Sequence, residues 1–126
     1  MLHRPGQREL LGWERPWRRR YWPLKAKKPV TVQMPAYAAF RWDAGQADFF
    51  LIYDTGALPV RSYRPALSAL ADWRDSSGGA MPSVVVWTMT PERSHAWEAL
   101  MSEVGQRNGG EPLPYVPLVP DGDDDL

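Results

Sequence analysis

The sequence predicts a small α/β (α+β) domain, a mixed sheet that begins with a β-hairpin and continues through βαβα crossovers. Three observations lead to this fold class. Ala47–Asp54 (ADFFLIYD) is an apolar, aromatic and β-branched run between polar turn residues, too short for a helix and suited to a central strand. Two segments with helical periodicity follow it, and a valine-rich run separates them. Strands that alternate with helices are typical of a sheet with helices packed against it.

The composition limits the class of protein. The chain has 126 residues, a one-domain length, and 44% of them are hydrophobic. It contains no cysteine, which excludes disulfides, thiolate chemistry and zinc sites that need Cys. No apolar run approaches the roughly 20 residues of a membrane span. The N-terminus lacks the apolar region of a secretory signal, so we expect a cytoplasmic protein.

Charge is divided along the chain and suggests three regions. Residues 1–28 hold nine Lys or Arg against two Glu, whereas the remaining 98 residues hold six against thirteen acids. We therefore expect a basic, Trp- and Arg-rich arm over residues 1–28, a single α/β domain over 29–119 and an acidic disordered tail over 120–126. A basic arm of this kind meets either an anionic partner or the chain's own acidic surface.

The basic arm contains the candidate nucleic-acid-binding residues. Arginines interleaved with aromatic residues are suited to phosphate contacts and to stacking on bases. The candidates are Arg15, Trp17, Arg18, Arg19, Arg20, Trp22, Lys25, Lys27 and Lys28. The prolines of the arm allow one short helix at most, near Gln7–Trp13. The alternative is that the Trp side chains pack on the domain or on a protein partner while the arginines are solvated.

The first half of the predicted domain is a hairpin. A short edge strand is expected near Lys28–Gln33 and a second strand at Ala36–Trp42. The turn Asp43–Gln46 joins the latter to Ala47–Asp54, and Gly45 can adopt the positive φ that such turns require.

Two helices and two further strands are expected in the second half. A helix from about Tyr63 to Arg74, with Ser62 as its N-cap, is followed by a buried strand at Ser83–Thr88. Thr90-Pro91-Glu92 is a typical helix start, and Gly105 is expected to end that helix. Tyr115–Val119 contains a proline, which restricts it to the edge of the sheet.

Asp54 is the best-placed residue for chemistry, because it lies at the carboxyl end of the central strand. It could bind Mg²⁺ or cap the turn that contains Gly56, and the capping role is the commoner one. No pattern for a nucleophile, a phosphate loop or a cofactor accompanies it. We therefore expect no cofactor, and Mg²⁺ only if the chain is a nuclease.

Several segments together resemble a known family. These are FFLIYDTG, an amphipathic helix containing Tyr63 and Trp73, and SVVVWTMTPERSHAWEAL. Over about Pro35 to Val104 they resemble the C-terminal domain of the replication-relaxation family, bacterial proteins of plasmids and integrated mobile elements. The resemblance implies a fold similar to that of the PD-(D/E)-x-K nucleases.

Departures from the family pattern bear on activity. Ala36 replaces one acid and Ile52 replaces another, while the helix Lys falls near Ala66, with Arg64 as the nearest basic residue. A metal nuclease needs two or three acids and a nearby cation. The resemblance therefore implies a non-catalytic, nuclease-like domain that binds DNA in mobile-element replication. The alternatives are an active Mg²⁺-dependent nuclease that uses Asp54 and Arg64, and a protein-interaction module that docks through its Trp-rich arm.

Overall fold

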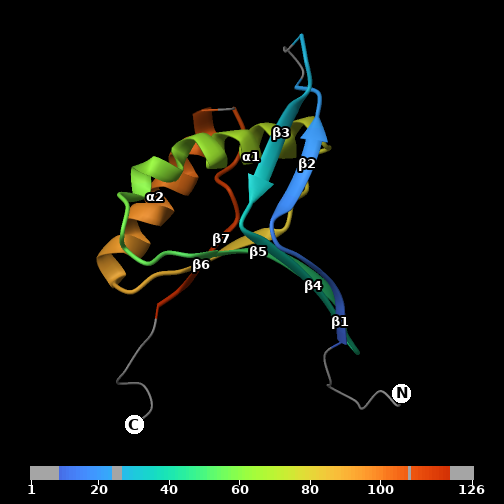
Figure 1. Cartoon of the computed structure of the whole chain (residues 1–126), viewed down its shortest axis with the longest axis horizontal. Helices are drawn as coiled ribbons and strands as arrows, with labels where there is room; N and C mark the ends of the chain where they lie inside the picture. Colours follow the sequence, from blue (N-terminus) through green and yellow to red (C-terminus); the bar gives the residue numbers. More distant parts are fainter. Residues whose placement is uncertain (1–8, 24–26, 108, 120–126) are drawn as a thin grey trace.

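A computed structural model of the chain describes residues 9–23, 27–107 and 109–119. It shows an α/β arrangement in which two helices lie on one side of a five-stranded sheet and a two-stranded ribbon lies beside them (Figure 1). The elements in chain order are β1 (Glu9–Glu14), β2 (Trp17–Tyr21), β3 (Val30–Met34), β4 (Ala36–Trp42), β5 (Gly45–Tyr53), the 3₁₀ turn η1 (Val60–Tyr63), α1 (Arg64–Ser76), β6 (Ser83–Trp87), α2 (Pro91–Arg107) and β7 (Tyr115–Leu118).

The five-stranded sheet has the order β1-β4-β5-β6-β7, so the predicted central strand is central. The predicted hairpin is confirmed: β4 and β5 pair antiparallel, with Trp42 opposite Gly45. Crossovers through α1 and α2 then add β6 and β7 in parallel, which makes the sheet mixed. The edge position of β7 accommodates Pro117, as the sequence predicts.

The core lies between this sheet and the two helices. Phe50 and Ile52 point from β5 towards the helices and are buried, whereas their neighbours in the strand point to the opposite face. Trp97 from α2 and Leu70 from α1 meet them and have no measurable exposure.

The helix ends agree with the sequence in part. The Thr90 hydroxyl accepts a hydrogen bond from the backbone N–H of Arg93 at 3.2 Å, which confirms the predicted N-cap of α2. Ser62 does not cap α1, because it lies within η1 and its hydroxyl donates back to the Pro59 carbonyl. Gly105 does not end α2 either. It lies inside the helix, where an added Cβ would stand 2.2 Å from the Glu111 carbonyl oxygen, so the glycine permits a close approach of the following chain.

The prediction of a short helix near Gln7–Trp13 is wrong for its described part. Residues 9–14 form β1, which pairs antiparallel with β4 and extends the main sheet. The register shifts between Leu10 and Gly12. Gly and Trp have weak helix propensity, so this segment gains more by pairing with the edge of β4 than by forming a helix.

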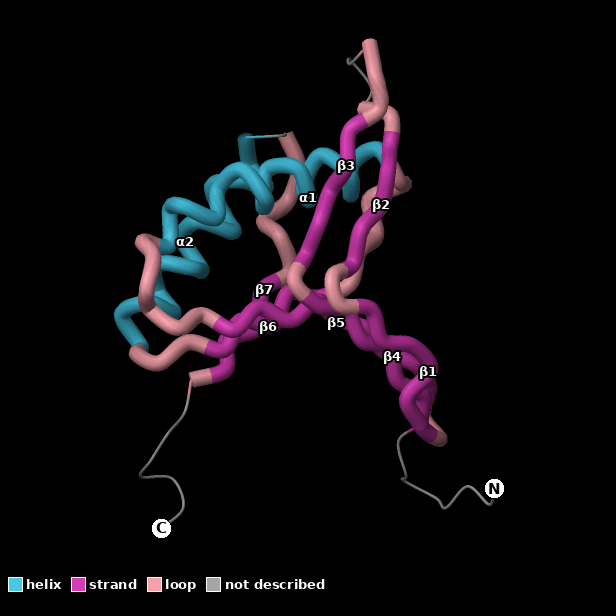
Figure 2. Tube along the Cα trace, in the orientation of Figure 1, coloured by secondary structure: helices cyan, strands magenta, loops and turns pink. Residues whose placement is uncertain are grey.

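The remaining described part of the predicted arm belongs to the ribbon β2–β3. Here β3 pairs with β2 and not with the main sheet, as Figure 2 shows. Trp17 at the start of β2 is buried in the core, edge-on to Phe50 at 4.6 Å and to Trp73 at 5.1 Å. Glu9–Glu14 and Trp17–Tyr21 are therefore strands of the fold and not an arm outside it. The predicted tail, 120–126, lies outside the described residues.

Candidate nucleic-acid interface

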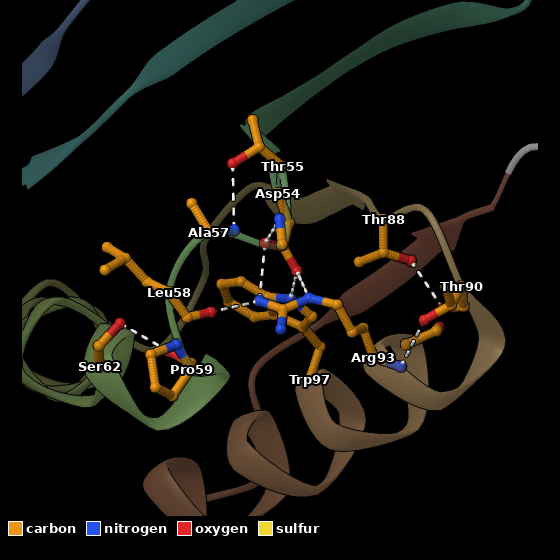
Figure 3. A network of polar contacts seen from close by, with 12 residues as sticks. Asp54, Thr55, Ala57, Leu58, Pro59, Ser62, Thr88, Thr90, Arg93 and Trp97 are labelled. Carbon is orange, nitrogen blue, oxygen red and sulfur yellow. Dashed lines mark hydrogen bonds and ion pairs between the residues drawn. The ribbon is translucent and has the colours of Figure 1, made fainter.

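Asp54 stands directly after β5 and is almost fully buried. Its carboxylate accepts two hydrogen bonds from the Arg93 guanidinium, at 2.7 and 2.8 Å, and one from the Trp97 indole N–H at 2.8 Å (Figure 3). The backbone N–H of Gly56 donates a fourth at 3.0 Å. The carboxylate thus joins the end of β5 to α2 and caps the following turn, which is one of the two roles expected from the sequence.

The electrostatics of Asp54 reflect these donors. Burial alone would raise its pKa, but the hydrogen bonds from Arg93, Trp97 and Gly56 outweigh burial and lower the pKa below its usual value. Arg93 also donates to the Leu58 carbonyl at 2.6 Å, which fixes the guanidinium between the loop and α2. A cation at Asp54 would have to displace Arg93, and within the described ranges no three carboxylate or imidazole groups converge on a metal position.

Arg64, the predicted cation for a nuclease, does not pair with Asp54. Its guanidinium pairs with Glu103 of α2, and Glu103 also binds Arg107. Arg64 and Arg93 line one groove of about 470 Å³ between η1 and α2. Arg93 is the partner of Asp54 that the sequence alone did not reveal. A signal in the sequence could have indicated this partner. β6 runs parallel to β5 and leads into α2, so the first turn of α2 lies near the end of β5. Arg93 is the third residue of α2.

The predicted nucleic-acid-binding residues divide between the two faces of the ribbon β2–β3. On the inner face, Trp17 is in the core and is no surface for stacking. Arg19 lies over the Trp17 ring at 4.9 Å and forms a bidentate pair with Glu14, at 2.8 and 2.9 Å. The burial of Trp17 corrects its assignment to the interface. The Arg19 side chain is 44% exposed beside Glu14, so its assignment stays a prediction.

The outer face of the ribbon is basic and exposed. Arg18 and Arg20 alternate with the inner residues, and their cross-strand partners are Gln33 and Thr31. The Arg18 Nε donates to the Gln33 side chain at 2.8 Å, which orients the guanidinium along the ribbon. Trp22, directly after β2, has 60% of its surface exposed.

The tip of the ribbon adds two more cations. Lys27 and Lys28 are exposed beside the turn, whereas Lys25 lies outside the described residues. Arg15, before β2, is also exposed. The described ribbon, 17–23 and 27–34, holds five Lys or Arg and no acidic residue. In the part of the chain that the structure describes, Arg18, Arg20, Lys27 and Lys28 have no carboxylate partner.

No family model, no curated protein and no solved structure matches the chain. The resemblance to the replication-relaxation family therefore stays a prediction. Among the described residues, no helix is long and apolar enough to cross a membrane.

Proposed function

We propose that the chain binds DNA through the outer face of the ribbon β2–β3, without catalysing a reaction on it. The observation that carries this proposal is the charge of the ribbon away from its inner face. Arg18, Arg20, Lys27 and Lys28 are exposed there, and the described ribbon contains no acid. A two-stranded ribbon has the dimensions to enter the major groove, and its cations can contact the flanking phosphates. Trp22 offers an exposed aromatic face to a sugar or an unpaired base.

The non-catalytic part of the proposal rests on Asp54. Its carboxylate already accepts four hydrogen bonds, one pair of them from Arg93. The alternative of an Mg²⁺-dependent nuclease built on Asp54 and Arg64 would need both residues to give up their present partners. The resemblance to the replication-relaxation family is the reason for proposing mobile-element replication as the setting.

The test is a salt series of DNA titrations with two matched double variants. Each phosphate contact contributes about 0.9 to the slope of log K against log salt on duplex DNA. Arg18→Ala with Arg20→Ala should therefore lower the slope by about 2 and weaken binding to all sequences alike. The control, Arg41→Ala with Arg107→Ala, removes the same charge from exposed positions away from the ribbon.

The control separates a ribbon contact from a general effect of net charge. If both double variants change the slope equally, the ribbon is not the contact surface. If labelled duplex and single-stranded DNA both fail to bind the unaltered chain at low salt, the proposed function is wrong.

A further inference from the structure

The face of the five-stranded sheet that points away from the helices is almost entirely apolar. Cross-strand partners share a face, so the register assigns the side chains of this open face. They are Leu10 and Trp13 of β1, Ala36, Ala38, Phe40 and Trp42 of β4, Ala47, Phe49, Leu51 and Tyr53 of β5, Ser83, Val85 and Trp87 of β6, and Val116 and Leu118 of β7. Ser83 is the single polar exception, and no member is charged.

Charged residues do occur in the same strands, but on the opposite face. Where the sheet extends beyond the helices, the helix-side positions of β1, β4 and β5 include four charged residues, Glu9, Glu14, Arg41 and Asp48. The strands thus place charge on the helix side and apolar groups on the open face. A sheet with one solvated face normally carries polar residues there.

The large side chains at both ends of the open face are exposed in the single chain, whereas Ala36 and Ala38 of β4 are buried. Leu10, Trp13, Tyr53, Trp87, Val116 and Leu118 are each between 42 and 56% exposed. Two aromatic contacts organise the surface: Phe40 stacks on Phe49 at 5.8 Å, and Tyr53 meets Trp87 edge-on at 5.5 Å. The helices and the ribbon both lie on the other side of the sheet (Figure 1).

The size of the open face matches what a stable dimer buries. Five strands about 4.8 Å apart and about 20 Å long give roughly 500 Å² of flat area. Aromatic side chains of about 150–250 Å² each rise from it and increase the accessible area. A standard interface buries about 800 Å² per partner, and homodimer interfaces are the most apolar class.

We infer that the open face binds the same face of a second copy of this chain, as a sheet-on-sheet dimer. Two such faces pack about 10 Å apart around a two-fold axis, so each copy covers the other. The absence of cations from the face disfavours DNA phosphates and anionic lipids as its occupant. The dimer would leave both β2–β3 ribbons on its outer sides, so this inference is independent of the DNA proposal.

The test measures mass by light scattering over a dilution series, on the unaltered chain and on charge variants. The mass should rise from 14.3 kDa towards twice that value as concentration increases. Trp13→Glu and Leu118→Glu place a charge at opposite ends of the open face, at positions about half exposed in the single chain. Each should weaken the dimer at least about 100-fold, because the interface would bury a carboxylate among apolar side chains with no cation to pair with it.

Leu58→Glu is the matched control, because Leu58 is 56% exposed in the loop before η1 and away from the sheet. It should leave the dimer unchanged, and melting curves check that all three variants are folded. A mass of 14.3 kDa up to about 1 mM overturns the inference. So does a dimer that both open-face variants leave intact, or a monomer that binds phosphatidylcholine vesicles through this face.

Discussion

Replacing Asp54 by Asn tests the role that the structure gives this carboxylate. Asparagine has nearly the same shape and can still accept from Gly56, but it removes the charge that Arg93 neutralises. Asp54 is 1% exposed and the Arg93 side chain 22%, so the remaining cation would be only partly hydrated. We expect the variant to fold with a lower free energy of unfolding.

The magnitude follows from the partners that are lost. Removing one member of a buried ion pair costs about 3–5 kcal/mol, and access of Arg93 to solvent places this pair near the lower limit, at about 3 kcal/mol. Urea denaturation followed by tryptophan fluorescence measures this difference. Asp48→Asn is the control, because Asp48 lies on the same strand but is exposed, and its change should stay within about 0.5 kcal/mol.

The effect has a defined pH dependence. The folded-state pKa of Asp54 lies below the unfolded value of about 3.9, so the stabilisation is complete above that value and is lost as pH falls through the folded-state pKa. The difference between the unaltered chain and Asp54→Asn should therefore be larger at pH 7 than at pH 3. An unchanged stability at pH 7, or a larger difference at pH 3, would refute the structural role.

Three other substitutions have definite outcomes. Phe50→Ala should cost about 3–5 kcal/mol by urea denaturation, because the ring has no measurable exposure. Trp17→Ala should cost a similar amount, and a stable variant that had lost only DNA binding would contradict the core position of this ring. Gly105→Ala should lower stability by about 1–3 kcal/mol, because the added Cβ collides with the Glu111 carbonyl. This cost should exceed the gain from the higher helix propensity of alanine. A melting temperature above that of the unaltered chain would show that no such collision exists.

The sequence predicts the fold from β5 onwards well because its signals there are local. The apolar run of β5, the valines of β6 and the Thr90 cap of α2 each specify one element without reference to the others. The crossover rule then orders β5, β6 and β7. These elements therefore appear in the structure close to their predicted bounds.

The first 28 residues are less predictable because long-range pairing decides their conformation. β1 gains its hydrogen bonds from β4, more than twenty residues away in sequence, and Trp17 gains its burial from Phe50 and Trp73. Local composition indicates only that the segment is basic and aromatic. The division of its residues into a core face and an exposed face appears once the ribbon pairing is known.

The candidate site was predicted only in part, because its residues come together through long-range pairing. Asp54 was identified from its place at a strand end, but its partner Arg93 comes from α2, 39 residues later. Their meeting depends on the parallel pairing of β5 with β6.

The most direct test of the proposed interface is the change in amide and indole NMR shifts on adding a short DNA duplex at low salt to the ¹⁵N-labelled chain. We predict that the affected signals belong to the outer face of the ribbon, at Arg18, Arg20, Trp22, Lys27 and Lys28, and that added salt reverses the changes. An unchanged spectrum, or changes confined to Trp13 and Trp87 on the open face, would contradict the account.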